Sequence, residues 1–132
     1  HGLEGHSDAD ALTHAVCDAL LGAMGEGDLG TYYPSSNPQY KNMNSLAMLD
    51  GIRKKLAEKG FSLVNLDSTI LAEAPRLAAF LADMGQSLAK TLEVDSSLVN
   101  VKVKSSDQLG AIGRKEGIGA QAVCLIEQKS FS

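Results

Sequence analysis

The chain has 132 residues, of which 44% are hydrophobic and 21% charged, and its formal net charge is −4 at pH 7. These values are typical of one globular domain and exclude a disordered tail, while lysine and arginine are too scattered to form a basic stripe for nucleic acid. No apolar run approaches the ~18 residues that cross a bilayer and no signal-peptide pattern is present, so we expect a soluble protein without a membrane partner.

Two helices are predicted in the first half of the chain. The first covers residues 8–24 and ends in a series of glycines. A loop rich in Gly, Pro, Ser and Asn follows over residues 25–44. Apolar residues at three- and four-residue spacing then predict a second helix over residues 45–59.

Strands dominate the second half. Partly alternating apolar residues predict a strand over residues 61–72, which ends before a proline. A third helix is predicted over residues 77–92, and a clean alternation predicts a strand over residues 98–103. A turn-rich loop over residues 104–117 precedes the last strand, at residues 118–128.

This order of elements predicts a single α+β domain over residues 1–132. We expect a small β-sheet with helices packed on one face, in a ferredoxin-like sandwich. The other face of such a sheet stays exposed unless copies of the chain associate. The pattern therefore also predicts a homo-oligomer.

Cys17 and Cys124 are far apart in the sequence, and neither belongs to a CxxC motif. This spacing argues against a disulfide framework and against a cysteine zinc site. We predict two reduced thiols, both mostly buried.

The first predicted helix carries the clearest sign of chemistry. In a helix that begins near Asp8, the side chains of Asp10, His14 and Asp18 recur every four residues on one face. Imidazole and carboxylate ligands at this spacing suit a divalent cation such as zinc. The same segment is also typical of an ordinary amphipathic helix with Ser7 and Asp8 at its N-cap, and two ligands do not complete a metal site.

Three loops have the composition of ligand-binding segments. Asp28 and Gly30 place an acidic side chain beside a turn, where it can accept hydrogen bonds from ribose hydroxyls. Residues 34–38 form a turn with two serine hydroxyls. Residues 104–107, followed by several glycines and Arg114, combine hydroxyls and cations in the manner of a phosphate-binding loop. The first two segments are more typical of ordinary turns, and the third is equally typical of a solvated loop.

Taken together, these motifs run in one order along the whole chain. The most specific are His-Ser-Asp at residues 6–8 and Gly-Arg-Lys-Glu-Gly at residues 113–117. With them come residues 4–22, 27–30, the loop at Pro34, and residues 72–76, 99–102 and 109–118. This set resembles the 2-C-methyl-D-erythritol 2,4-cyclodiphosphate synthase family in order and spacing.

The resemblance implies a lyase of the non-mevalonate route to isoprenoid precursors. Its substrate would be 4-diphosphocytidyl-2-C-methyl-D-erythritol 2-phosphate, whose 2-phosphate attacks the β-phosphorus within the same molecule. An eight-membered cyclic diphosphate forms and CMP leaves. The resemblance also implies a homotrimer with active sites between subunits, located in a bacterial cytoplasm or a plastid-type organelle.

The resemblance also assigns roles to residues. It implies a divalent metal, usually zinc, at His14, with magnesium or manganese on the diphosphate, and transition-state stabilisation by His6 and Ser105. Ser7, Tyr33, Pro34, Ser35, Ser36 and Asn37 would contact the erythritol end, and Asp28, Leu29 and Gly30 the ribose. The cytidine pocket would comprise Ala72, Glu73, Ala74, Pro75, Arg76, Leu77 and Ala78. Lys104, Ser106, Asp107, Ala111 and Arg114 match the remaining substrate positions, most of them around the phosphates.

The chain departs from the family in one important way. The family begins with a strand whose Asp-x-His pair supplies the other two metal ligands, and no such pair precedes His6. Either the sequence omits this strand, which we expect, or the protein cannot form the family's usual zinc site. A smaller departure is Ser35, which stands where an acid is usual and weakens the expected sugar contact.

Two other functions remain open at this point. A non-catalytic trimeric relative that binds cytidine nucleotides would keep Asp28, Gly30 and the pocket at residues 72–76 and would lack the metal, and the missing Asp-x-His pair favours it. A metal-dependent phosphohydrolase would need a general base near His14, for which Asp10 is the candidate. The product, cyclic diphosphate or free phosphate, distinguishes the hydrolase from the synthase.

Overall fold

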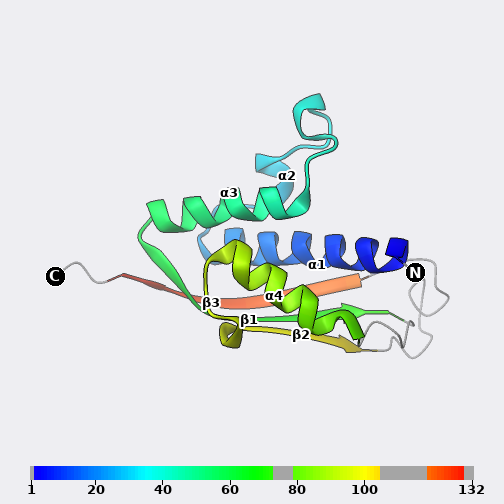
Figure 1. Cartoon of the computed structure of the whole chain (residues 1–132). Helices are drawn as coiled ribbons and strands as arrows, with labels where there is room; N and C mark the ends of the chain where they lie inside the picture. The colour runs from blue at the N-terminus through cyan, green and yellow to red at the C-terminus, as the bar shows by residue number, and fades with distance from the viewer. Residues whose placement is uncertain (1, 73–78, 105–118, 130–132) are drawn as a thin grey trace.

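The computed structural model describes residues 2–72, 79–104 and 119–129, with side chains from residue 8 onward. Figure 1 shows its elements, and none of its helices in these ranges is both long and apolar enough to cross a bilayer. In chain order they are α1 (Gly2–Ala23), α2 (Leu29–Tyr32), the 3-10 helix η1 (Pro38–Tyr40), α3 (Ser45–Glu58), β1 (Phe61–Leu71), α4 (Leu81–Leu92), the 3-10 helix η3 (Ser96–Leu98), β2 (Val99–Lys104) and β3 (Gly119–Gln128).

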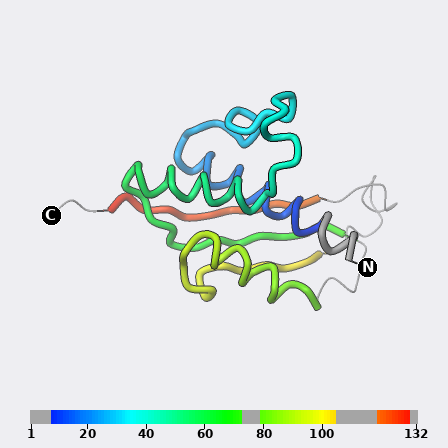
Figure 2. The backbone as a smooth tube through the Cα atoms, turned by 45° about the horizontal axis from the view of Figure 1, so that its top comes forward, coloured from blue at the N-terminus to red at the C-terminus, as the bar shows by residue number. Residues whose placement is uncertain are grey.

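The three described strands form one mixed sheet in the order β2-β1-β3. β1 runs parallel to β2 and antiparallel to β3. The helices lie on one side of this sheet, where α1 packs against β3 and α4 against β2, with α3 above α1 (Figures 1 and 2). The predicted α+β class with helices on one face is confirmed, whereas the ferredoxin-like arrangement and the homotrimer stay predictions.

The core lies between the sheet and the helices. Alternate residues of β1 point into it, and Leu66 and Ile70 are fully buried. The helices contribute leucines at helical spacing, because one apolar stripe of each faces the sheet. Among the described side chains, the fully buried apolar ones are Leu12, Val16, Cys17, Leu20, Leu21, Leu49, Leu66 and Ile70.

A β-bulge interrupts the alternation near the start of β1. Leu63 pairs with Ile126 and Asn65 pairs with Leu125, so Val64 is an extra residue on β1. Because of this insertion, Leu63 and Leu66 both face the core although three positions separate them. The bulge therefore keeps two large apolar side chains on the same face.

The observed boundaries correct several predictions. Helix α1 begins at Gly2, so Ser7 and Asp8 lie inside the helix and are not its N-cap. The predicted loop over residues 25–44 contains α2 and η1. Helix α4 begins at Leu81, later than the predicted residue 77, and residues 73–78 lie outside the described ranges.

Candidate functional site

The predicted polar stripe of α1 divides into two parts. His14 Nε2 lies 3.8 Å from Asp10 Oδ2, and both side chains are about half exposed, at 44% and 53%. Asp18, in contrast, accepts the N–H of Leu29 at 2.7 Å and so holds the first residue of α2. The stripe is therefore one His–Asp pair and one structural anchor, rather than three equivalent ligands.

The described side chains fit a divalent metal only in part. The His14 imidazole and the Asp10 carboxylate are ligand types that zinc accepts. Within residues 8–72, 79–104 and 119–129, no group of three His, Cys, Asp or Glu side chains is close enough together to hold a metal ion. The described residues thus provide part of a metal-binding set and do not complete one.

Asp28 begins helix α2. Its Oδ1 accepts the backbone N–H of Thr31 at 3.0 Å and the Thr31 hydroxyl at 2.9 Å. This is the usual role of aspartate at an N-cap, where it satisfies an otherwise unpaired helix N–H. The side chain is exposed, so the predicted ribose contact would lie at the surface, beside Leu29 and Gly30 in the same short helix.

Sequence reasoning missed a cluster of charged residues that connects the segment after α1 with α2 and the end of α3. Lys59 Nζ donates to Glu26 Oε2, Tyr32 Oη donates to Glu26 Oε1 at 2.7 Å, and Lys55 Nζ lies 3.2 Å from Oε1. These three partners, with Lys59 first, lower the pKa of Glu26 from 4.5 to about 2. Lys55 also lies 4.7 Å from the centre of the Tyr32 ring, a cation–π distance. We call these four residues the Glu26 corner.

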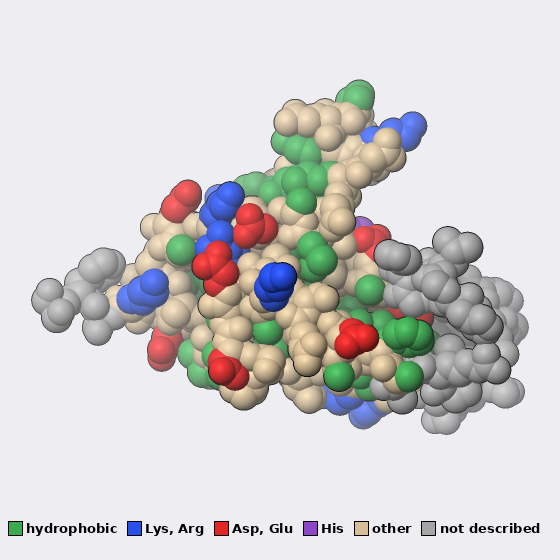
Figure 3. All heavy atoms as spheres, viewed as in Figure 1, with side chains coloured by type: hydrophobic (Ala, Val, Ile, Leu, Met, Phe, Trp, Pro, Cys, Tyr) green, Lys and Arg blue, Asp and Glu red, His purple; other side chains and the backbone are tan. Residues whose placement is uncertain are grey.

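Residues 33–44, which we call the arm, carry the other predicted sugar contacts. The arm projects from α3 on the side away from the sheet (Figure 1), and Figure 3 shows it standing clear of the body. Within it, the Asn37 N–H donates to the Pro34 carbonyl at 3.0 Å, and the Asn37 side chain accepts the N–H of Gln39 at 2.9 Å. Ser35 and Ser36, between these contacts, are exposed.

Further predicted positions meet at one end of the sheet. The N–H of Ala72 donates to the carbonyl of Lys104 at 3.1 Å, and Leu71 pairs with both Lys104 and Gly119. The N-terminal end of α1, the helix that contains His6 and Ser7, lies at this same end (Figure 1). The predicted residues outside the described ranges are Glu73, Ala74, Pro75, Arg76, Leu77, Ala78, Ser105, Ser106, Asp107, Ala111 and Arg114.

The sheet face opposite the helices carries no described helix. Asp67 lies on it beside Lys102, and Asn100 Nδ2 donates to Asp67 Oδ1 at 2.9 Å. These contacts, with Lys102 first, hold the pKa of Asp67 below its usual value. Val123 and Leu125 on β3 are 65% and 60% exposed, and because they are two positions apart they lie on the same face of the strand. We call this surface the open face.

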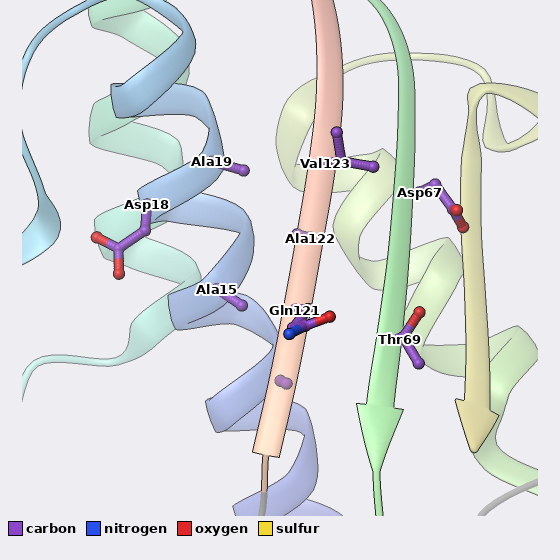
Figure 4. Close-up of a pocket in the computed structure, with 9 residues that line it drawn as sticks. Ala15, Asp18, Ala19, Asp67, Thr69, Gln121, Ala122 and Val123 are labelled. Atoms are coloured by element: carbon purple, nitrogen blue, oxygen red, sulfur yellow. The ribbon is translucent and has the colours of Figure 1, made fainter.

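A surface pocket of about 520 Å³ runs along β3 between α1 and the open face. Ala15 and Ala19 point toward the strand, whereas Asp18 points away from it (Figure 4). The lining residues are Ala15, Asp18, Ala19, Asp67, Thr69, Ala120, Gln121, Ala122 and Val123. Asp18 belongs to the predicted polar stripe of α1, and none of the residues that the family resemblance assigns to the site lines this pocket.

Both cysteines are free thiols, as predicted. Cys17 is fully buried, and burial raises the pKa of its thiol to about 12. Cys124 is partly buried and donates to the Ala19 carbonyl at 3.5 Å. Neither thiol has the lowered pKa of a reactive cysteine.

Comparison with known proteins accounts for this collection of motifs. The model of the YgbB family matches residues 1–127. The chain belongs to the YgbB family. A relative from Desulforamulus reducens, named 2-C-methyl-D-erythritol 2,4-cyclodiphosphate synthase, is 50% identical over 127 residues, which is 96% of this chain and 81% of the relative. The resemblance inferred from the sequence is therefore confirmed.

Solved structures of this family agree with the fold. The bifunctional IspDF of Campylobacter jejuni matches with a TM-score of 0.87 and 40% identity over 93% of this chain, which spans 33% of that larger protein. The IspF of Plasmodium falciparum, solved as a CDP complex, matches with a TM-score of 0.80 and 28% identity, covering 91% of this chain and 72% of that one. The YgbB fold thus extends over almost the whole chain.

Proposed function

We propose that this YgbB-family chain converts 4-diphosphocytidyl-2-C-methyl-D-erythritol 2-phosphate into 2-C-methyl-D-erythritol 2,4-cyclodiphosphate and CMP. An oxygen of the 2-phosphate forms a bond to the β-phosphorus, the bond from that phosphorus to the bridging oxygen breaks, and CMP leaves with that oxygen. The observation that carries this proposal is the match over residues 1–127 to a family in which relatives bear the synthase name, one of them 50% identical to this chain.

The residue roles follow from the same proposal. We assign transition-state stabilisation to His6 and Ser105, and phosphate contacts to Lys104 and Arg114. Two anionic phosphates must approach each other, and cations and hydrogen-bond donors aimed at them compensate the developing charge. The meeting of Ala72 and Lys104 at one end of the sheet supports a shared site for the nucleotide and phosphate segments.

A divalent metal is part of the proposal. We assign His14 to a zinc site and expect magnesium or manganese on the diphosphate. A bound divalent cation would polarise a phosphoryl oxygen at this site. The exposed His14–Asp10 pair supports a ligand position on α1, and the remaining ligands would come from groups beyond the described residues. Zinc content measured by mass spectrometry should fall in His14→Ala, independently of any activity.

We also propose a homotrimer with its active sites between subunits. The exposed Val123 and Leu125 of the open face support an association surface. The predicted substrate contacts lie in two separate parts of the chain: the arm projects beyond α3, whereas Ala72 and Lys104 lie at the end of the sheet. This separation supports active sites that two subunits form together. Cytidine nucleotide binding is proposed for this chain because IspF structures of the family were solved with CDP.

The decisive experiment supplies the diphosphocytidyl substrate to the purified protein. Release of CMP is followed by chromatography, and the second product is identified by ³¹P NMR. Equal amounts of CMP and cyclic diphosphate are expected. Free phosphate in place of the cyclic product would indicate a phosphohydrolase, and CDP binding without turnover would indicate a non-catalytic relative.

Variants of the two proposed catalytic residues test the assignment within the site. His6→Ala and Ser105→Ala should each lower kcat about 100-fold while CMP affinity changes little, because groups that act on the transition state contribute little to ground-state binding. Isothermal titration of CMP and steady-state kinetics measure the two quantities. Equal losses of kcat and CMP affinity would contradict these roles.

A further inference from the structure

Gly51 lies in the interior of helix α3, where glycine is the least favourable residue apart from proline. A Cβ atom at this position would lie 2.3 Å from the Tyr33 hydroxyl oxygen, closer than any real contact of this kind. The same Cβ would lie 3.6 Å from Tyr33 Cζ, which is ordinary van der Waals distance. The hydroxyl of Tyr33 therefore occupies the space that a side chain at position 51 would fill.

Tyr33 is also the first residue of the arm and contacts three other parts of the chain. Its N–H donates to the Leu29 carbonyl at 2.8 Å, which ends helix α2. Its ring meets the Tyr40 ring edge-on, with 5.2 Å between the ring centres and 80° between their planes. It packs against the hydrophobic core and is partly buried, and this burial raises the pKa of its phenol. Tyr33 thus connects α2, α3 and η1.

From this geometry we propose that Tyr33, seated over Gly51, is a positioning residue that fixes how the arm presents Pro34 to Asn37 to the phosphorylated sugar end of the substrate. The inference rests on the proposed function and adds Gly51 to the residues that determine substrate binding. Gly51 itself touches no substrate. Its role is to leave the space in which the Tyr33 hydroxyl lies.

The alternative is that Gly51 is a neutral glycine, and the chain offers a matched comparison. Gly22 lies in helix α1, and a Cβ built on it would meet nothing within 4 Å. Alanine at such a site stabilises a helix because it has less backbone entropy to lose than glycine. If Gly51 were neutral, alanine there would behave as alanine does at position 22.

The test is a double-mutant cycle of Gly51→Ala and Tyr33→Phe, with Gly22→Ala as control. Gly51→Ala places its Cβ against the Tyr33 hydroxyl and should displace the ring. Tyr33→Phe removes that hydroxyl and leaves only the ordinary 3.6 Å contact with the ring. The second substitution should therefore make the first one harmless. Each variant is measured by steady-state kinetics and by hydrogen exchange of the arm amides, including those of Asn37, Tyr40 and Met43, which donate within the arm.

In the wild-type background, Gly51→Ala should raise KM about tenfold with kcat changed less than about twofold, because ground-state contacts are lost. Exchange of the arm amides should accelerate while the amides of α1 keep their rates. In the Tyr33→Phe background, the same substitution should change KM by less than about twofold, the sign of a coupled pair. Gly22→Ala should change neither KM nor arm exchange.

Two results would overturn the inference. One is an unchanged KM together with unchanged arm exchange in Gly51→Ala. The other is an equal penalty from Gly51→Ala in the wild-type and Tyr33→Phe backgrounds. If the wild-type protein forms no cyclic product, the proposed function fails, and the exchange measurements still decide whether Tyr33 over Gly51 holds the arm.

Discussion

Two regions of this molecule each contain a carboxylate beside a lysine, and they use it differently. In the Glu26 corner, the carboxylate is bonded by Tyr32 and Lys59 and lies close to Lys55, so groups from α2 and the end of α3 converge on the end of α1. On the open face, Asp67 contacts Lys102 and Asn100 of the neighbouring strand. The first carboxylate joins separate elements, whereas the second joins strands that the backbone has already paired.

The surroundings of the two carboxylates differ as well. The Glu26 corner satisfies the charge of its carboxylate with groups of the same chain. The open face places its ion pair near Val123 and Leu125, each more than half exposed. Exposed apolar side chains around a satisfied polar pair are typical of association surfaces. In the proposed homotrimer, the Glu26 corner needs no contact with another subunit. The open face, in contrast, is buried only when a second copy packs against it.

The largest effect is expected from a charge on the open face. Leu125→Asp should convert the protein to monomers and lower cyclic-product formation by roughly 100-fold or more, because an unpaired carboxylate would be buried between subunits. Sedimentation velocity and the product assay measure the two effects. Ala47→Asp, at an exposed site on α3, is the control and should stay assembled. An assembled and active Leu125→Asp protein would show that the open face is not the interface.

The Glu26 corner should be visible in the dependence of stability on pH. The pKa of Glu26 is lowered from 4.5 to about 2, so the unfolded state binds more protons between these values and stability is lost as the pH falls through them. In Glu26→Gln this loss should be smaller. Urea unfolding at a series of pH values measures it. The remaining slope belongs to groups such as Asp50 and Asp95, whose pKa values are also lowered. A slope equal to that of wild type would contradict the assignment.

A smaller effect is expected from the anchor of α2. Asp18→Ala removes the acceptor of the Leu29 N–H and should cost about 1 kcal/mol, as the loss of a helix cap does. CDP affinity should fall with it, because Asp28 and Gly30 lie at the same short helix. Asp18→Asn keeps an acceptor and serves as the control. Unfolding by urea and CDP titration are the measurements, and equal effects of the two variants would mean that the hydrogen bond is unimportant.

The smallest effect concerns the ion pair of the open face. Its side chains are 41% exposed for Lys102 and 35% for Asp67, so their coupling energy should be about 0.5 kcal/mol in a monomer. A double-mutant cycle with Asp67→Ala and Lys102→Ala, made in the Leu125→Asp background, measures it. The same cycle in the assembled protein should give a larger value, because a covered pair is less screened by water. Identical values would place the pair outside the interface.

Much of the fold was predictable because it follows from periodic apolar residues. The spacing of leucines predicted α3, and alternation predicted β2 and β3 to within one residue at each end. The beginning of α1 was wrong because Ser7 and Asp8 have the composition of an N-cap, while the helix continues to Gly2. Helix α2 and η1 have four and three residues, too few to produce a periodic signal.

Parts of the site formed by residues close together in the sequence could be predicted, whereas contacts between residues far apart in the sequence could not. Asp28 beside Gly30 indicated a special turn, and the structure adds that Asp28 caps α2. The contact of Glu26 with Lys59 spans 33 positions, and no local pattern indicates it. Gly51 did leave a signal, since a glycine inside a helical apolar pattern needs a reason. Only the structure shows that the reason is Tyr33.

The bulge at Val64 gives β1 one residue more than its pairing with β3 requires. Deleting this one residue would restore regular alternation and leave Leu63 two positions before Leu66, so both side chains would still face the core. A scan by substitution would find Val64, a partly exposed residue, tolerant of change. A scan by single-residue deletion should find the same position among the most tolerant in the strand, because Leu63 and Leu66 keep their partners Ile126 and Cys124.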